Sequence, residues 1–184
     1  MKKGFTLIEL LIVIGILAIL AVVSVLVLNP AQLLAQARDS QRISDLGTIK
    51  SAISLWLATT TSTPVFTSEV GRFTVSGATC GMGSCTDFNA TTTVDGNGWV
   101  GVNLTQTTGG SSLSSLPLDP TNNTTYFYAF RGENDSVTFE LNARLESERY
   151  RALMKTDGGE DSACTDWTGA DCFYEVGTDA DLNL

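Results

Sequence analysis

The sequence predicts an α+β protein in which a long N-terminal α-helix packs on a small antiparallel sheet whose loops are closed by disulfides. Three observations lead to this fold class. An uncharged apolar run of 19 residues, Leu10–Leu28, precedes a second helical pattern with apolar side chains on one face. Beyond it, short β-type segments alternate with loops rich in glycine and threonine. All four cysteines lie in this last part of the chain.

The apolar run has the length of a membrane-spanning helix. At about 1.5 Å per residue, it spans roughly 29 Å, close to the hydrocarbon thickness of a bilayer. Lys2 and Lys3 precede it, so the positive-inside rule keeps the N-terminus cytoplasmic and sends the rest of the chain outward. Glu9 stands beside the run, and a carboxylate is costly in lipid. Glu9 is therefore a candidate functional residue.

Residues 4–10 read Gly-Phe-Thr-Leu-Ile-Glu-Leu, which resembles the class III signal of type IV pilins and type II secretion pseudopilins. The resemblance covers roughly residues 1–60. It implies that a prepilin peptidase cuts between Gly4 and Phe5 and methylates Phe5. It also implies that Glu9 pairs with the N-terminal amine of a neighbouring subunit during assembly. Such pairing would satisfy two charges that lipid solvates poorly.

This resemblance and the composition divide the chain into four predicted parts. They are a leader at 1–4, a transmembrane and filament-core helix at 5–29, an amphipathic helix half at 30–61, and a globular head at 62–184. Pro30 marks the boundary between the two helix halves. Because proline removes a backbone donor and clashes with the preceding turn, we expect a helix kink there.

The second helical segment carries one apolar stripe, which predicts that it packs on the sheet and ends within 58–61, before Pro64. The stripe consists of Leu46, Ile49, Ile53, Trp56 and Leu57.

The head is expected to contain short strands and one further helix. The predicted strands are 99–104, 125–130, 137–143 and an edge strand at 174–176, with a hairpin turn at 131–135 and a short helix at 145–155. In the strand at 137–143, the side chains of Val137, Phe139 and Leu141 are expected to point inward.

The loop at 116–120, Leu-Pro-Leu-Asp-Pro, followed by Tyr-Phe-Tyr at 126–128, resembles part of the major pseudopilins. The match is partial, because Thr-Asn-Asn-Thr at 121–124 replaces the expected Trp-Gly-Asn-Pro. The choice between a pilus and a secretion pseudopilus therefore stays open.

The cysteines predict an oxidising compartment, because they are even in number and follow an apolar N-terminal segment. Four cysteines allow three connectivities, of which we favour Cys80–Cys85 and Cys164–Cys172. The alternative is one zinc site formed by all four thiolates. The second pair has seven intervening residues, which departs from the usual two to four.

Composition excludes several classes of function. The net charge of −9 disfavours nucleic acid as a main partner. The chain has no histidine, so Ser-His-Asp and Cys-His catalysis and histidine-ligated metals are excluded, and we expect no enzyme activity. We predict neither a cofactor nor a metal. Asp-Gly-Gly-Glu-Asp at 157–161, with Asp179 and Asp181, is expected to be a solvated acidic surface. Calcium binding is the alternative, because some pseudopilins bind calcium, but the spacing lacks the EF-hand pattern.

The expected function is that of a pilin, a structural subunit of an extracytoplasmic filament. Its partners are other copies of itself, the prepilin peptidase and an inner-membrane assembly platform. The precursor is expected in the cytoplasmic membrane and the filament at the cell surface. Alternatives are a secretion pseudopilin, a membrane-anchored binding domain that never assembles, and a secretory protein cleaved after Ala37.

Overall fold

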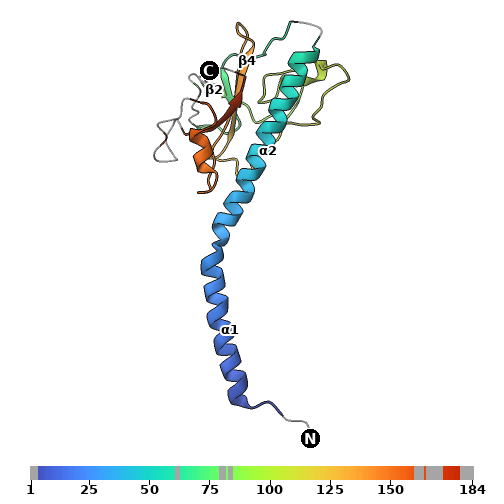
Figure 1. Ribbon diagram of the computed structural model, residues 1–184. Coiled ribbons are helices and arrows are strands. Elements are labelled where there is room, and N and C mark those ends of the chain that lie inside the picture. The colour runs from blue at the N-terminus through green and yellow to red at the C-terminus, as the bar shows by residue number, and fades with distance from the viewer. Residues whose placement is uncertain are drawn as a thin grey trace. The chain divides into compact units, whose positions relative to one another are not determined.

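Figure 1 shows a computed structural model of the chain, which describes residues 4–60, 63–78, 82, 85–159, 164 and 172–178. The chain divides into two compact units, Met1–Ala35 and Gln36–Leu184. Its helices are α1 (Leu7–Leu28), α2 (Pro30–Thr59) and the short 3-10 helices η1 (Leu104–Gln106) and η2 (Arg151–Lys155). Its strands are β1 (Gly71–Phe73), β2 (Cys85–Phe88), β3 (Tyr128–Glu133), β4 (Thr138–Ala143) and β5 (Tyr174–Gly177).

Helix α1 is apolar on all sides. Every α1 side chain that the structure describes is exposed, and Glu9 is the one charged residue of the helix. By length and composition, the helical stretch that contains α1 is long and apolar enough to cross a membrane. A surface of this kind requires either lipid or other apolar helices around it.

The helical hydrogen bonding is interrupted at Asn29. This residue caps α1 in the left-handed region, with φ of 39°. Pro30 is then the first residue of α2, where a missing N–H costs nothing because it has no helical acceptor. The break thus falls one residue before Pro30, while a bend at this point stays a prediction.

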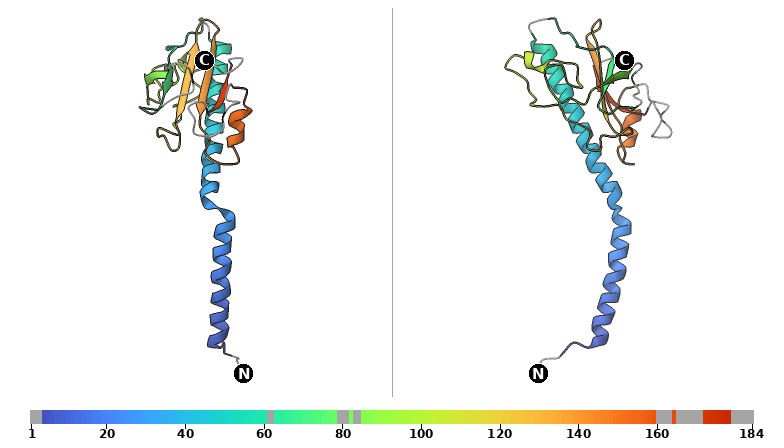
Figure 2. Two further views of the ribbon diagram at one scale, coloured as in Figure 1. Left: turned by 90° about the vertical axis from the view of Figure 1, so that its left-hand side faces the viewer. Right: turned by 180° about the vertical axis from the view of Figure 1, so that it is seen from behind.

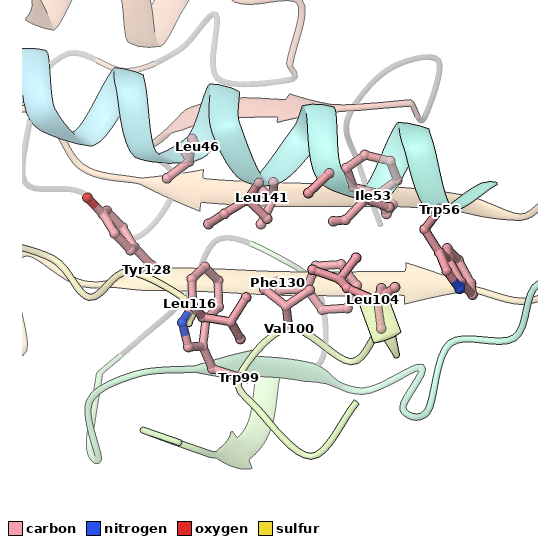
Figure 3. Close-up of a cluster of buried hydrophobic side chains, with 14 of the residues drawn as sticks. Leu46, Ile53, Trp56, Trp99, Val100, Leu104, Leu116, Tyr128, Phe130 and Leu141 are labelled. Atoms are coloured by element: carbon pink, nitrogen blue, oxygen red, sulfur yellow. The ribbon is translucent and has the colours of Figure 1, made fainter. Parts of the chain in front are cut away.

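From Gln36 onward, α2 packs on one face of the sheet (Figures 1 and 3). Its apolar stripe confirms the predicted contact, because Leu46, Ile49 and Ile53 are fully buried and Trp56 nearly so. Leu57 is partly buried at the edge of the same cluster. The helix ends at Thr59, within the predicted range.

The sheet has five strands in the order β2-β1-β3-β4-β5. All neighbouring pairs are antiparallel except β1 and β2, which are parallel. The α+β class, with a long helix on a mostly antiparallel sheet, is therefore confirmed. Figure 2 shows the same layers from two further sides.

Both faces of the sheet are covered. Tyr128 and Phe130 contribute to the core under α2, whereas Phe127 and Ala129 contribute to a second buried cluster. This alternation is what the two-residue period of a strand produces when both of its faces are buried. The second cluster also contains Phe73, Met82 and Phe173.

The predicted strand at 99–104 is wrong. The segment is a buried loop, with one isolated bridge between Asp95 and Asn103. Its backbone bonds to other loops, for example from Trp99 N–H to the Thr91 carbonyl at 2.9 Å. Its apolar side chains are buried because they pack in the same core cluster as α2 and the sheet, so their hydrophobicity gives the same sequence signal as a strand.

Other boundaries in the head differ from the prediction. Strand β3 begins at Tyr128, and its turn lies at 134–137 instead of 131–135. Of the predicted helix at 145–155, only the last five residues are helical, and they form η2. Before η2, the backbone N–H groups of Glu146 and Ser147 donate to the Asp39 carboxylate, which fixes this segment against α2.

The predicted strands near the C-terminal end are confirmed. Strand β4 matches 137–143 within one residue, and Phe139 and Leu141 are fully buried under α2. Strand β5 is an edge strand that pairs with β4, as predicted for 174–176. The sequence prediction did not include β1 and β2, which are only three and four residues long.

Candidate functional site

The candidate processing site lies just before α1. Gly4 and Phe5 are exposed and precede the helix, which begins at Leu7. Phe5 is 82% exposed. The Gly4–Phe5 peptide bond is therefore outside the helical hydrogen bonding and open to a peptidase.

A capping box fixes the start of α1. Thr6 is the N-cap residue, and its hydroxyl accepts from the Glu9 N–H at 3.2 Å. In return, the Glu9 carboxylate accepts from the Thr6 N–H at 2.9 Å and from the Thr6 hydroxyl at 2.8 Å. These bonds satisfy donors at the helix end that have no intrahelical partner. The Glu9 side chain is thereby folded back toward the processing site.

Residues 1–25 match the family described as the prokaryotic N-terminal methylation motif. The chain carries this methylation motif. The match includes Gly4, Phe5, Thr6 and Glu9, together with most of α1. No curated protein and no solved structure matches the chain.

The methylation motif and the apolar helix together support a membrane-anchored precursor of the type IV pilin or pseudopilin kind. The motif implies that a prepilin peptidase processes the chain. The match ends at residue 25 and does not cover the head.

A buried ionic cluster joins α2 to two loops of the head. Arg42 lies at its centre with a side chain that is 0% exposed. Its guanidinium donates to Asp119 at 2.6 and 3.0 Å, to Asp39 at 2.8 Å and to Glu146 at 2.7 Å. Arg38 adds a second pair to Glu146 at 2.6 Å. Three carboxylates thus share two guanidinium groups.

The charges of this cluster shift the pKa values of Arg42 and Glu146. Burial alone would lower the pKa of Arg42, but the hydrogen bonds and charges of its carboxylate partners, Asp119 first, raise it. Burial would raise the pKa of Glu146, but Arg38 and Arg42 outweigh it, so the pKa is lowered. Both groups therefore stay charged at neutral pH.

We predict that Glu146 makes the head sensitive to acid. Its folded-state pKa is lowered, so its contribution to stability is present above about pH 4.5 and is lost as the pH falls through the folded-state value. Glu146→Gln should lower the unfolding midpoint at pH 7 and show a flatter decline in acid than the wild type. Denaturant unfolding from pH 7 to pH 3 measures both effects.

The matched control for this prediction is Glu148→Gln, which removes an exposed carboxylate from the same loop. The pH dependence of wild-type stability also includes a contribution from Asp45. Burial raises the pKa of Asp45, so its contribution to the free energy of unfolding has the opposite sign to that of Glu146. The difference between the wild type and Glu146→Gln isolates Glu146. Parallel pH curves for these two proteins would contradict the prediction.

The C-terminal disulfide is confirmed. Cys164 and Cys172 are joined, with their Cα atoms 5.2 Å apart. No described cysteine is free, and Cys85 is also disulfide-bonded. Its predicted partner, Cys80, lies outside the described residues, so that pairing stays a prediction. The disulfide excludes a zinc site of all four thiolates.

Further contacts tie the C-terminal disulfide to the sheet. Arg144 donates to the Cys172 carbonyl at 3.2 Å, and its guanidinium lies 4.6 Å from the ring centre of Phe173. Phe173 packs edge-on against Phe127. The disulfide therefore closes a segment whose end is fixed in the second buried cluster.

We predict that peptide mapping under non-reducing conditions will recover Cys164–Cys172 and Cys80–Cys85. Each closes a short loop, so the chain-entropy estimate is roughly 2–3 kcal/mol of stability for each disulfide. The Cys164→Ser/Cys172→Ser variant should lose about that amount in denaturant unfolding. Four reactive thiols in the exported protein would contradict both the pairing and the oxidising compartment.

The acidic segment is only partly described. The Asp157 carboxylate accepts from Glu175 N–H at 2.9 Å and from Gly159 N–H at 3.3 Å. Burial raises the pKa of this carboxyl. Within the described residues, no group of three or more His, Cys, Asp or Glu side chains could hold a metal ion. The remaining carboxylates of the calcium alternative, Glu160, Asp161, Asp179 and Asp181, lie outside the described residues.

The sequence alone predicts Gly4, Phe5 and Glu9 as site residues, and these roles stay predictions; it did not predict the capping role of Thr6 or the cluster around Arg42. The capping role of Thr6 could have been predicted, because threonine followed three residues later by glutamate is the signature of a capping box. The cluster around Arg42 could not have been predicted, because Asp119 is 77 positions away in the sequence.

Proposed function

We propose that this chain is a structural subunit of a type IV pilus-like filament. The observation that carries the proposal is the exposed, non-helical Gly4–Phe5 junction directly before a capped apolar helix. A peptidase that cuts there creates a new amine at Phe5. Glu9 supplies a carboxylate at the same helix end, within a segment that otherwise carries no charge.

The physics of the apolar helix favours assembly. Lipid covers α1 in the precursor, but its exposed apolar side chains need another cover once the subunit leaves the membrane. The α1 helices of neighbouring copies provide such a cover. Within that bundle, the Phe5 ammonium of one copy and the Glu9 carboxylate of the next neutralise each other, because either charge alone would be costly.

The proposed partners follow from this route. They are the prepilin peptidase, an inner-membrane assembly platform and other copies of the chain. The precursor is a single-pass protein of the cytoplasmic membrane with its N-terminus inside, and the filament stands at the cell surface. We propose a structural role without enzymatic activity, because the chain has no histidine and no assigned nucleophile and base.

A second candidate is a pseudopilin of a type II secretion system. It is favoured by the loop at 116–120, which resembles a segment of the major pseudopilins. In the head, this loop is held by Trp99, whose indole N–H donates to the Pro117 carbonyl at 3.0 Å, and by the pair of Asp119 with Arg42. Deletion of the gene discriminates the two, because loss of protein export with surface filaments intact supports the pseudopilin.

We predict that the mature chain begins with methylated Phe5. Filaments sheared from cells should contain the chain, and mass spectrometry should find an N-terminal peptide that lacks residues 1–4 and carries one extra methyl group. Recovery of an intact Met1 terminus from filaments would contradict the processing step. Absence of the chain from every sheared or secretion-linked filament would contradict the proposed function.

The variant for this prediction is Gly4→Glu. A charged side chain at the residue before the scissile bond should block the cut and leave the precursor in the membrane. Gly15→Ala is the matched control, because it changes a glycine inside α1, where an added Cβ meets no atom within 4 Å. It should be processed like the wild type.

A further inference from the structure

We propose that Thr6 is the positioning residue of the assembly site, holding one oxygen of Glu9 and leaving the other for a neighbouring subunit. This inference rests on the proposed function. It assigns a role to a residue that the processing site and the charge pair do not use.

The hydrogen bonds divide the carboxylate into two parts. The Thr6 N–H and the Thr6 hydroxyl both donate to Oε2 of Glu9, at 2.9 and 2.8 Å. Within the described residues, no hydrogen bond to Oε1 is found. A carboxylate accepts about four hydrogen bonds in total, so Oε1 retains its capacity. A methylated ammonium keeps two N–H donors and can occupy that oxygen.

The reciprocal bond fixes the side chain. The Glu9 N–H donates to the Thr6 hydroxyl at 3.2 Å, so backbone and side chain of Glu9 hold the same threonine. Glu9 therefore points toward the processed terminus, where the ammonium of a neighbouring copy must enter. A freely rotating glutamate would lose conformational entropy on pairing, and pre-orientation removes much of that cost.

The same bonds make Glu9 tolerable before assembly. A carboxylate without donors is strongly disfavoured in an apolar medium, and two donors from its own helix end reduce that penalty. The positive end of the helix dipole acts in the same direction. Thr6 thus stabilises the lone subunit without occupying the oxygen that assembly needs.

The cleavage position preserves this arrangement. The cut falls between Gly4 and Phe5, so the amide that joins Phe5 to Thr6 remains and still donates to Glu9. A cut one residue later would turn that amide into the terminal ammonium, which could then neutralise Glu9 of its own chain in place of a neighbour's. Processing therefore releases a new ammonium and leaves the positioning bonds intact.

Three variants of the full-length chain, each expressed as the only copy, separate positioning from helix capping. Thr6→Ser keeps both the cap and the hydroxyl donor. Thr6→Gly keeps a fair N-cap residue but removes the donor, and Thr6→Val removes both. The control is Ser24→Ala, which removes an α1 hydroxyl that donates to the Leu20 carbonyl.

The measurement is sheared filament divided by the membrane pool of processed chain, with cleavage verified by N-terminal mass. Thr6→Ser and Ser24→Ala should match the wild type. Thr6→Gly and Thr6→Val should each fall about tenfold or more, as expected for the loss of a hydrogen bond to a charged group. Wild-type yield from Thr6→Gly would overturn this inference alone, because capping would then suffice. Absence of filament from the wild type would overturn it together with the proposed function.

Discussion

Glu9→Leu is expected to be cleaved and held in the membrane, yet to yield several hundred times less filament than the wild type. The substitution removes the carboxylate and leaves the Phe5 ammonium of a neighbour unpaired in an apolar bundle. Breaking a well-buried ion pair by removing one partner costs about 3–5 kcal/mol. That energy corresponds to a factor of roughly several hundred or more in an equilibrium constant.

Two further substitutions at this position grade the effect. Glu9→Asp keeps the charge with a shorter reach, so it should fall between the wild type and Glu9→Leu. Glu9→Gln keeps an acceptor for Thr6 but carries no charge, so it should assemble nearly as poorly as Glu9→Leu. This order is expected only if assembly depends on the negative charge of Glu9. If assembly depended only on the bonds from Thr6 to Glu9, Glu9→Gln should assemble better than Glu9→Leu.

The measurement is the amount of sheared filament against the membrane-bound pool, with each variant expressed as the only copy. In a membrane anchor that never assembles, Glu9 is only a liability. Glu9→Leu would then insert better and behave normally otherwise, because an apolar residue replaces a charge. Normal filament yield from Glu9→Leu would remove the assembly role from this residue.

The two N-terminal helices were predictable because their sequence signals are local. A run without charge identifies α1, and one apolar stripe identifies the face of α2 that meets the sheet. Both patterns depend only on the 3.6-residue period of a helix and on the cost of charge in lipid. Strand β4 was found for a similar reason, since Phe139 and Leu141 alternate along one face.

The head was less predictable because its loops are as buried as its strands. Trp99 and Val100 are completely buried, yet they lie in a loop that bonds to other loops. Local hydrophobicity cannot separate such a segment from a strand. The opposite error occurred at β1 and β2, which are strands that the sequence did not predict. Three or four residues are too few to show the two-residue period of a strand.

The second site feature, the cluster around Arg42, depends entirely on tertiary structure. An arginine in an amphipathic helix is normally solvated, and nothing near Arg42 in the sequence indicates a buried one. Its main partner, Asp119, lies in a loop, and the Asp119 carboxylate also accepts from the backbone N–H groups of Thr121 and Asn122. Only the fold brings that loop to α2, so the cluster could not have been derived from spacing.

Arg42→Met is expected to destabilise the head by about 3–5 kcal/mol, because it leaves buried carboxylates without their cation. Asp39 and Asp119 have side chains that are 0% exposed, so water cannot replace the guanidinium. Arg38 cannot compensate, since its own pair is directed at Glu146. The free energy of unfolding of a domain is typically about 5–15 kcal/mol, so the folded state of the variant should be only marginally stable.

Two arginine controls set the scale for this loss. Arg38→Met removes a side chain that is 37% exposed, and ion pairs of that kind contribute at most about 1 kcal/mol. Arg149→Met removes an exposed arginine beside Tyr150 and should be nearly neutral. The expected order of destabilisation is therefore Arg42 far above Arg38, with Arg149 last. Denaturant unfolding of the full-length chain in detergent, followed by the fluorescence of buried Trp56 and Trp99, measures it.

A double-mutant cycle with Asp119→Asn tests whether the loss comes from stranded charge. The substituted amide would keep an oxygen for the backbone N–H groups of the loop but carry no charge to leave unpaired. If stranded charge dominates, Arg42→Met should cost less in the Asp119→Asn background than alone, with a coupling of at least about 1 kcal/mol. Additive losses, or an Arg42→Met effect no larger than that of Arg149→Met, would show that the cluster does not hold α2 to the head.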